Sequence, residues 1–438
     1  MNTDLTPWLP CQAACELMGS TCFFLSIKDS AVLINGPRWC ASIAASEMAS
    51  IDKKYEKRIF CSELQEKDLL YGTGENLLAA LEELKGEMTP SFLGILTSCS
   101  ASLIGDDLNG ICLSAGMKCP LAVLDSGGLR GEFYTSYRRA LEKFIDTLSF
   151  PRMTRNPRTV NIIGWCSAYP NHRGDLAEIK RILSLAGIRI GICLGAEDTR
   201  LDDLAHFRKA SLNIVLCPEL GEAAARQLKE KYGMNFLLSH MPCGLDGTLA
   251  WVRSVARALQ IEPDMAALEK EAAEEKEQVD AALSRLKINN RDLSSVIIFA
   301  NLTEGTARGL LPALMDEYPD TGCLYLRMEG TPRKEKAEKE KSLIQSRPDR
   351  DNVFLWKEGM PLSLPEEGPI LVLGNTFTRG EIGHYQRAVY VNLLSPAINL
   401  SVPSKCYAGL RGWLFFLSDI FREIYTLAYM NRTKPESQ

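Results

Sequence analysis

The sequence predicts an α/β protein with several lobes, and three observations predict it. The chain has 438 residues, which is too long for one hydrophobic core and fits two to four domains of ~100–200 residues each. Short, almost continuous apolar runs recur along it, and such runs are typical of parallel strands that are covered on both faces. Amphipathic stretches with helical spacing lie between these runs, as in β-α-β units.

The strands and helices are expected to alternate from about residue 77 onwards. Residues 175–187 are expected to form a helix, because their apolar residues have helical spacing and a glycine suited to a C-cap ends them. This alternation predicts three Rossmann-like lobes, each a mostly parallel sheet flanked by helices. The apolar runs that we expect to form strands are residues 91–97, 160–165, 189–194, 212–217, 295–300, 322–328 and 369–374.

Two segments mark the expected lobe boundaries. Proline and arginine are frequent at residues 150–159, just before a new strand, and residues 264–286 carry apolar residues at helical spacing. The second segment is expected to form a long connecting helix, with a coiled-coil dimer stripe as the alternative. We therefore expect an N-terminal lobe at 1–155, a middle lobe at 156–290 that ends in this helix, and a C-terminal lobe at 291–438.

Composition excludes several classes of partner. The formal net charge is −5, with 46% hydrophobic and 24% charged residues, so we expect neither nucleic acid nor a membrane as partner. We find no apolar stretch near the ~18 residues that a transmembrane helix needs. The first residues have neither a basic segment nor an apolar segment of the kind found in secretory leaders. We expect a cytoplasmic protein.

The chain has 14 cysteines and only four histidines. In the reducing compartment expected here, most thiols pack in the core and a few serve as metal or cluster ligands. His172, His206, His240 and His384 show no metal-ligand spacing relative to one another.

Three cysteines stand out by their position. Cys15 precedes an apolar helical stretch, Cys40 follows a Gly-Pro turn after the strand-like run AVLIN, and Cys99 follows the strand at residues 91–97. The last two therefore lie at carboxyl ends of strands, where open α/β sheets place their ligands. Thiolate sulfur is the soft ligand that binds the irons of iron–sulfur clusters, so three converging thiolates could hold such a cluster. The spacing is not that of a compact cluster motif, so simple core packing stays open as the alternative.

Several motifs in this sequence resemble those of the nitrogenase component 1 family. They include CELMG at Cys15, INGPRWC ending at Cys40 and TSCSASLIGDDL around Cys99. Further similar segments follow in the family's order up to GLRGWLFFLSDI near the end. The family comprises the α and β chains of the molybdenum–iron protein, their cofactor-assembly scaffold paralogues, and the catalytic subunits of dark-operative protochlorophyllide reductase.

The resemblance implies an iron–sulfur cluster shared between two homologous subunits, in an α2β2 heterotetramer. Cys15, Cys40 and Cys99 would bind one side of it. The cluster would be either an 8Fe-7S type with three cysteines from the partner or a 4Fe-4S type with one foreign ligand. Asp106 and Asp107 would cap the helix that follows, where negative charge is favourable, and Gly105 would shape its start.

Cys217 follows the apolar strand LNIVL. At the matching position, some family members have a cysteine that binds iron of a second, larger metal cofactor. The resemblance therefore implies that role for Cys217, and a core cysteine at a strand end is the alternative. Cys243 and Cys406 lie near the expected pocket, where packing is the favoured interpretation.

The chain also departs from the family pattern. The stretch at residues 394–413 lacks the histidine that binds the catalytic cofactor in dinitrogen-reducing α chains. The family's glycine–histidine pair has no counterpart at residues 125–137, and Asn35 replaces a turn histidine. Without these groups, dinitrogen reduction is not expected. A reductase of another substrate or an assembly scaffold fits the losses better.

No GxxxxGK[ST] phosphate-binding loop occurs in the sequence, so ATP must be handled elsewhere. The family uses a separate, ATP-dependent iron protein that passes single electrons to the interface cluster. We therefore expect an anaerobic iron–sulfur oxidoreductase that receives electrons from such a protein and passes them through the interface cluster to a substrate or cofactor. Two alternatives stay open: a scaffold for nitrogenase-type cofactor assembly, and a cluster-free binding protein with the same fold.

Overall fold

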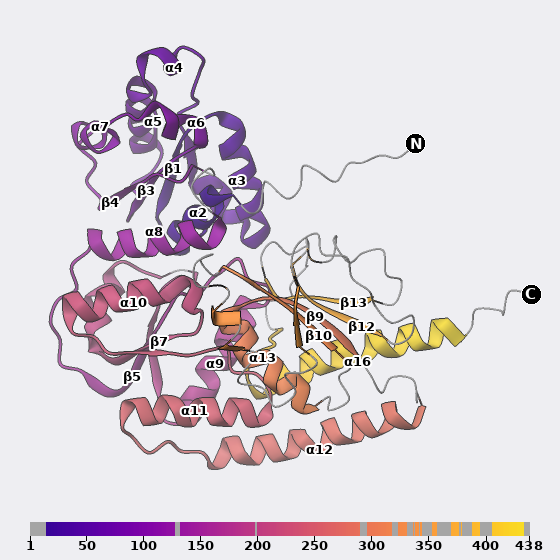
Figure 1. Cartoon of the computed structure of the whole chain (residues 1–438). Coiled ribbons are helices and arrows are strands. Elements are labelled where there is room, and N and C mark those ends of the chain that lie inside the picture. Colours follow the sequence, from indigo (N-terminus) through magenta and orange to yellow (C-terminus); the bar gives the residue numbers. More distant parts are fainter. Residues whose placement is uncertain are drawn as a thin grey trace, which may run out of the picture. The chain divides into compact units, whose positions relative to one another are not determined.

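The computed structural model describes most of the chain as two compact units (Figure 1). Unit 1 comprises residues 1–168 and 190–238, and unit 2 comprises residues 169–189 and 239–438. Each unit is described by itself. No helix within the described residues is both long and apolar enough to cross a lipid bilayer. The described residues are 15–127, 132–197, 199–289, 296–317, 323–330, 336, 338–340, 342–343, 353–356, 369–375, 378, 388–394 and 405–432.

The first sheet of unit 1 is parallel, with strand order β2-β1-β3-β4. Its two central strands are entirely buried, as expected for strands that are covered on both faces. The strands are β1 (Ala31–Asn35), β2 (Ile59–Cys61), β3 (Leu93–Thr97) and β4 (Leu121–Leu124). The helices are α2 (Glu16–Ser26), α3 (Arg38–Ile51), α4 (Asp68–Tyr71), α5 (Gly74–Glu87), α6 (Cys99–Ile104), α7 (Leu108–Ser114) and α8 (Phe133–Thr147), with the short 3-10 helix η1 (Lys53–Arg58).

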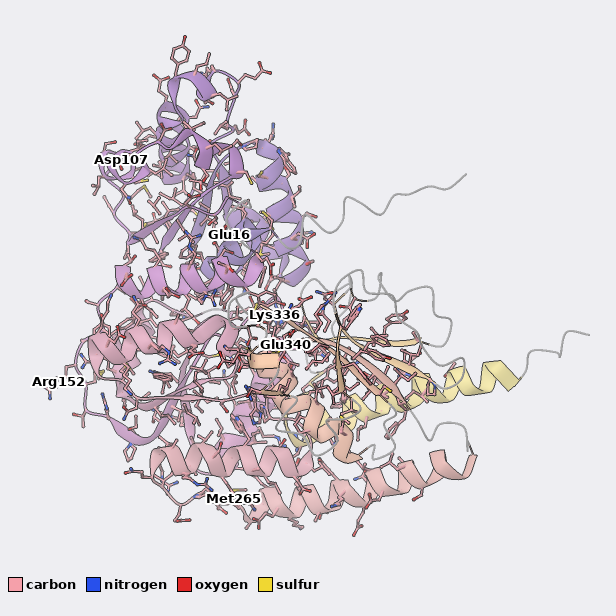
Figure 2. The ribbon with its side chains drawn as sticks, viewed as in Figure 1. Glu16, Asp107, Arg152, Met265, Lys336 and Glu340 are labelled. Atoms are coloured by element: carbon pink, nitrogen blue, oxygen red, sulfur yellow. The ribbon has the colours of Figure 1, made fainter. Side chains whose placement is uncertain are left out.

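Helix α2 is buried along its whole length and packs against α8. Its one charged residue, Glu16, is labelled in Figure 2 and forms an ion pair with Arg139 of α8. Further along α2, the ring of Phe23 meets those of Tyr137 and Phe144 edge to face, with centroids 5.4 and 5.5 Å apart. Such aromatic pairs are worth about 0.5–1.5 kcal/mol beyond the area they bury. This packing holds the start of α2 in a defined place.

The second sheet of unit 1 has the order β6-β5-β7-β8. Strand β7 pairs in parallel with both β5 and β8. Helix α10 begins with a proline at its first turn and ends at Gly233 in the left-handed conformation, which are the usual start and stop signals of a helix. The elements are β5 (Asn156–Ile163), β6 (Arg189–Cys193), the 3-10 helix η2 (Asp202–Lys209), β7 (Ala210–Val215), α10 (Pro218–Tyr232) and β8 (Phe236–Leu238).

Unit 2 contains a parallel sheet with the order β11-β10-β9-β12-β13. Its central strand, β9, is buried at every residue. The strands are β9 (Ile297–Thr303), β10 (Cys323–Glu329), β11 (Val353–Leu355), β12 (Ile370–Gly374) and β13 (Ala388–Asn392). The described helices include α9 (His172–Leu185), α11 (Leu245–Leu259), α12 (Ala266–Asn289), α13 (Glu304–Glu317) and α16 (Gly409–Arg432).

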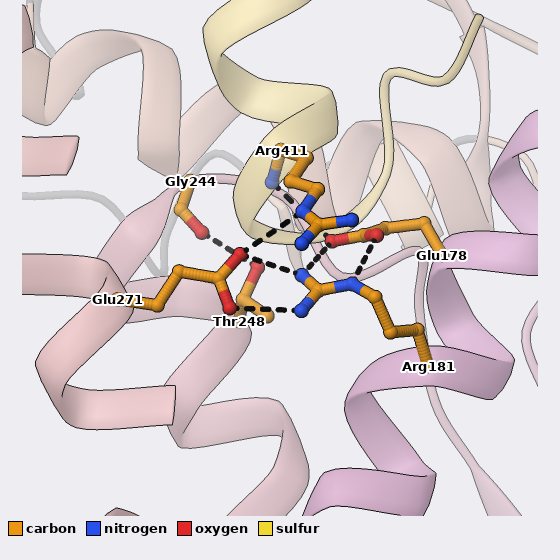
Figure 3. A network of polar contacts seen from close by, with 6 residues as sticks. All are labelled: Glu178, Arg181, Gly244, Thr248, Glu271 and Arg411. Carbon is orange, nitrogen blue, oxygen red and sulfur yellow. Dashed lines mark hydrogen bonds and ion pairs between the residues drawn. The ribbon is translucent and has the colours of Figure 1, made fainter. Parts of the chain in front are cut away.

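A charged network connects three helices of unit 2 (Figure 3). Arg181 of α9 contacts Glu178 at 2.7 Å and Glu271 of α12 at 2.8 Å. Arg411 of α16 also reaches Glu271, at 3.3 Å. Because Arg181 donates two bonds to each carboxylate, its planar guanidinium fixes the relative orientation of α9 and α12.

The fold class that the sequence predicts is confirmed. Every expected strand is present, and the helix expected at residues 175–187 is α9, at His172–Leu185. The long helix is α12, and Leu268, Ala272 and Val279 of its apolar stripe are buried within unit 2. This chain covers those residues by itself, so they do not need a coiled-coil partner. Each expected lobe contains the strands of one sheet, and the boundaries between lobes stay a prediction.

Candidate functional site

The carboxyl ends of β1 and β3 lie side by side and lead to two of the predicted cysteines. The two strands are parallel, with Asn35 opposite Thr97 in their last pair. Cys40 lies in the first turn of α3, which follows β1, and Cys99 is the first residue of α6, which follows β3. This arrangement follows from the parallel pairing, since parallel strands end at the same edge of a sheet.

Gly36 allows the two cysteine-bearing loops to approach each other. A Cβ atom at Gly36 would lie 2.5 Å from the Cβ of Ser98, much closer than two carbon atoms can come. Ser98 caps α6 by accepting a hydrogen bond from the Ala101 amide. The glycine of the GPRWC segment is therefore needed for the close contact that sets Cys40 beside Cys99.

Cys15 completes a group of three thiols. It directly precedes α2 and forms an isolated β-bridge with Glu132. Burial, followed by the nearby thiols of Cys15, Cys99 and Cys61, raises the pKa of Cys40 to about 12. The structure thus brings the other two predicted cysteines within electrostatic range of Cys40.

Cys61 is a fourth cysteine in this neighbourhood, and sequence reasoning missed it. It ends β2, opposite Ile34 of β1. Its thiol donates a hydrogen bond to the Gly36 carbonyl oxygen at 3.3 Å and accepts one from the Glu63 amide at 3.4 Å. Strand β2 is only three residues long, so no apolar run revealed its end. We call Cys15, Cys40, Cys61 and Cys99 the rim thiols.

A network of hydrogen bonds connects the turn after β1, which leads to Cys40, with neighbouring loops. Asp106 accepts hydrogen bonds from the amide and hydroxyl of Thr73, and the Thr73 hydroxyl accepts one from Asn35. Asn35 in turn accepts from Ser62, whose hydroxyl oxygen accepts from the Gly36 amide. The chain of bonds ties the turn after β1 to the loops before α5 and α7.

The two aspartates after α6 have different roles. Asp107 caps α7 by accepting from the Gly110 amide at 3.1 Å, as the sequence predicts. Asp106 instead bonds to Thr73, the residue before α5, because the chain turns back at Gly105 in the left-handed conformation, with φ of 77°. The expectation that both aspartates cap the same helix is wrong for Asp106.

The rim is accessible and partly apolar. Cys99 is exposed, while Cys15 and Cys40 are half-buried. Trp39, next to Cys40, is 62% exposed, and Leu103, on the next turn of α6 after Cys99, is 76% exposed. Helix α4 adds an exposed Tyr71. Exposed large apolar side chains in one region are typical of a surface that another protein covers.

The rim thiols suit iron by their donor chemistry. Within the described part of the chain, no group of three or more His, Cys, Asp or Glu side chains is placed to hold a single metal ion. In iron–sulfur clusters several Cys thiolates serve as ligands to different irons of one cluster, so the ligands need not all meet at one ion. Soft thiolates on a half-exposed rim fit a cluster better than a lone ion.

Cys217 lies in a different environment, inside unit 1. It directly precedes α10 and is 2% exposed. Burial, then the neighbouring Glu219 and Cys193, raises the pKa of its thiol. The Tyr137 hydroxyl lies nearby and donates a hydrogen bond to the Trp165 carbonyl oxygen.

Three further cysteines surround the same tyrosine, and sequence reasoning did not group them. The pKa of Tyr137 is raised well above its ordinary value, first by burial and then by four thiols, those of Cys166, Cys22, Cys193 and Cys217. All four are buried. They come from α2, β6 and the ends of β5 and β7, so only the tertiary fold brings them together. We call them the interior thiols.

Two interior thiols, Cys22 and Cys166, interact with each other. The pKa of Cys22 is lowered, first by hydrogen bonding with Cys166, although burial opposes the shift; Ser167 and the Ala168 amide also lower it. The sulfur of Cys22 lies 3.7 Å from the Ser167 hydroxyl oxygen. These two interior thiols therefore have hydrogen-bond partners within this chain.

The other predicted residues lie in unit 2 or outside the described residues. Burial, then the charge of Asp175, raises the pKa of both Cys243 and Cys406, and both side chains are buried, as packed core cysteines are. The ring of His172 contacts the Tyr169 carbonyl oxygen at 3.0 Å. His384 lies outside the described residues.

Comparisons with known proteins give the family. The model of the family described as "Nitrogenase component 1 type Oxidoreductase" matches residues 15–300. The chain is 27% identical over 281 residues to the nitrogenase iron-molybdenum cofactor biosynthesis protein NifE of Nostoc sp., covering 62% of this chain and 57% of that protein. It is 32% identical over 206 residues to a subunit of the light-independent protochlorophyllide reductase of Methylobacterium radiotolerans, covering 45% and 38%. The chain spans about half the length of the curated relatives it matches.

A solved structure shows the same fold. The structure "Nitrogenase Cp1 at pH 6.5" superposes with a TM-score of 0.73 over 97% of this chain and 94% of that chain, at 16% sequence identity. At this identity the likeness concerns the fold. The evidence of descent is the family match, which covers 286 of the 438 residues, from 15 to 300. The chain therefore belongs to the nitrogenase component 1 type oxidoreductase family.

Proposed function

We propose that this chain is a subunit of a nitrogenase-like iron–sulfur oxidoreductase, in which Cys15, Cys40 and Cys99 bind a cluster shared with a homologous second subunit. One observation carries the proposal: Cys40 and Cys99, beyond the carboxyl ends of β1 and β3, lie within electrostatic range of each other, and Cys40 also lies within range of Cys15, from a distant segment. The family match agrees with it.

A bare thiolate is unfavourable at the rim unless a cation balances its charge. Burial, then the neighbouring thiols, raises the pKa of Cys40 to about 12, because a thiolate there loses hydration and is repelled by the other thiolates. A metal removes this penalty, since a coordinating thiol loses its proton and its charge is balanced by the cation. A bound cluster would supply one-electron transfer. The chain's own part is to hold three sulfurs at an accessible edge.

The exposed surface around the rim supports a protein partner. Trp39 and Leu103 flank the cysteines and are mostly exposed in this chain. A homologous subunit that covers them would bury apolar area and supply the remaining cluster ligands, as in an α2β2 assembly. The cluster would be of the 4Fe-4S type or the 8Fe-7S type, depending on what the partner supplies.

The electron donor is proposed to be a separate, ATP-dependent iron protein. The sequence of this chain contains no GxxxxGK[ST] motif for binding ATP phosphates. A cluster at the rim would lie close enough to the surface of unit 1 to accept electrons. We propose that the assembly works in an anaerobic cytoplasm, where thiols and reduced clusters persist.

Iron analysis tests the proposal. The chain is purified anaerobically together with its co-expressed homologous partner, and iron and acid-labile sulfide are measured per chain. Wild type is expected to hold both, and Cys99→Ser is expected to lose most of the iron, because serine oxygen is a harder ligand than thiolate. Cys119→Ser is the matched control, since Cys119 is a half-buried thiol that is not among the thiols acting on Cys40. A stable complex without iron would refute the proposal.

A cofactor-assembly scaffold is the second candidate. Several relatives are NifE proteins, whose name describes cofactor biosynthesis, and Cys217 is the candidate ligand for a second, larger cofactor. The buried position of Cys217 beside Glu219 and Cys193 means that its surroundings must open before a large group could reach it. Transfer of a bound cluster from this protein to an apo-enzyme would favour the scaffold. Turnover of a substrate with the iron protein and ATP would favour the reductase.

A further inference from the structure

An arginine-lined cavity lies in unit 1, away from the rim thiols. It has a volume of about 420 Å³ and is lined by Arg152, Met153, Arg155, Arg208 and Tyr232. Arg152 belongs to the proline- and arginine-rich segment before β5, and its side chain projects outward from the ribbon in Figure 2. Cavities of about 300–1,000 Å³ are typical of small-molecule sites.

No carboxylate lines this cavity, and within the described residues none forms an ion pair with its three arginines. Lys231, next to Tyr232 in the sequence, forms an ion pair with Asp146. A chain of net charge −5 thus places three guanidinium groups without a carboxylate partner around one small cavity. Such a concentration of one charge attracts an ion of opposite charge.

Arg155 and Arg208 are held in place but keep most of their donors. Arg155 donates to the Gly233 carbonyl oxygen at 2.8 Å. Arg208 donates to the carbonyl oxygens of Phe150 and Tyr232 at 3.3 and 3.4 Å, which are long for N–H···O bonds, and its guanidinium lies 5.3 Å from the Tyr232 ring centroid. A guanidinium has five N–H donors, so each still has several to offer a ligand.

We propose that this cavity binds a phosphorylated small molecule that carries two phosphate groups. A phosphate group carries about −1.5 to −2 charges near neutral pH, so two such groups balance three guanidiniums. Phosphate oxygens also match the planar, bidentate geometry of arginine. The Tyr232 ring and the Met153 side chain offer apolar contact beside the charged groups.

The structure also offers a simpler role, in which the arginines only stabilise the end of α10. Arg155 and Arg208 do bond to carbonyl oxygens at this helix end, where cations are favourable. Arg152 has no such bond and still lines the cavity. It is therefore the residue that separates the two roles.

Calorimetric titration with inorganic pyrophosphate tests the proposal on the full chain. Wild type is expected to bind pyrophosphate, more tightly than inorganic phosphate, and to bind it less tightly as salt is raised. Arg152→Gln is expected to weaken binding by ~10–100-fold, the loss typical of one charge-assisted contact, with an unchanged melting temperature. Arg226→Gln is the control. It also removes one positive charge, but Arg226 is on α10, does not line the cavity and is paired with Glu222.

The other outcomes overturn the proposal. Absence of pyrophosphate binding to the folded wild type refutes the site. Equal losses in Arg152→Gln and Arg226→Gln mean a diffuse surface effect and refute it too. Tighter binding of citrate than of pyrophosphate refutes the assignment to a phosphorylated ligand. Iron content is measured in parallel, so failure at this cavity is distinguished from failure at the rim.

Discussion

Unit 1 contains two groups of four thiols whose surroundings differ. Three of the rim thiols lie at or just after strand ends and Cys15 precedes α2; one of the four, Cys99, is exposed. The interior thiols are all buried around Tyr137. In the rim, burial and neighbouring thiols raise the pKa of Cys40. In the interior, hydrogen bonds from Cys166, Ser167 and the Ala168 amide lower the pKa of Cys22.

The two groups differ in burial and in what surrounds the sulfurs. A buried polar group needs partners, and Cys22 and Cys166 of the interior thiols have them within unit 1. The rim combines accessible thiols, a chemically unfavourable crowding of sulfur and exposed apolar side chains, and these features together favour a ligand or partner from outside the chain. The number of cysteines in the sequence does not distinguish the two groups, because only their surroundings in the fold differ.

The largest expected effect is on thiol reactivity. In the protein without iron at pH 8, Cys99 is expected to react with iodoacetamide on the order of 100-fold faster than Cys22, because buried groups react only when the structure opens locally. Peptide mass spectrometry after timed quenching measures each rate. Cys22 has the lowered pKa, so equal rates at the two sites would mean that the interior is accessible and would break the comparison.

Cys40 gives a pH signature within the same experiment. Its pKa is raised to about 12, so at pH 8 nearly all of it is the unreactive thiol. Its rate is expected to rise ~10-fold per pH unit between pH 8 and 10, because the thiolate is the nucleophile. A rate that is already level at pH 8 would contradict the raised pKa of Cys40.

A buried carboxylate in unit 2, Asp175, extends the comparison to a group whose hydrogen-bond partners all come from this chain. Asp175 accepts hydrogen bonds from the amides of Tyr407 and Ala408, at 2.6 and 2.9 Å. Burial nevertheless raises its pKa from 3.8 to about 6, with His172 opposing the shift and Glu178 adding to it. The folded protein therefore holds a proton between these pH values that the unfolded chain releases, so stability falls as pH rises through this window.

Asp175→Asn is expected to remove this pH dependence, since the amide oxygen keeps both hydrogen bonds and carries no charge. Between pH 4 and pH 7 the free energy of unfolding of wild type should fall relative to the variant by about 2 kcal/mol, most of the linkage for a shift of this size. Urea unfolding at each pH measures it. Parallel curves for the two proteins would contradict the raised pKa.

A smaller effect is expected from Gly36→Ala. The added Cβ would lie 2.5 Å from the Cβ of Ser98, so the loops of Cys40 and Cys99 must separate, at a cost of ~1–3 kcal/mol typical of overpacking. Gly86→Ala is the control, because a Cβ there meets nothing within 4 Å and alanine favours the helix. Iron retention should fall only in Gly36→Ala. Equal stability and iron content in both variants would remove the role given to Gly36.

The sequence predicts the long buried strands well and the short ones poorly. Apolar runs identify β3, β7 and β12, because strands covered on both faces are apolar at every position. Strands β2, β8 and β11 have only three residues each, which is too few for periodicity to emerge. Cys61 was missed for this reason, since its importance depends on where β2 ends.

The site was predictable only in part. Cys40 and Cys99 follow recognisable strands, so the parallel pairing of β1 and β3 explains their proximity. The interior thiols come from segments separated by up to about 195 residues, from Cys22 to Cys217, and nothing local relates them. The hydrogen bonds between Asp106 and Thr73 depend in the same way on the turn at Gly105, whose direction cannot be deduced from the sequence alone.

Thiol footprinting of the anaerobic, iron-loaded complex tests the central claim most directly. Labelling before and after iron removal by a chelator, read by peptide mass spectrometry, reports which sulfurs bind metal. The account predicts that Cys15, Cys40 and Cys99 are protected together and become reactive together when iron leaves. Iron loss that leaves the labelling of these three cysteines unchanged would contradict it.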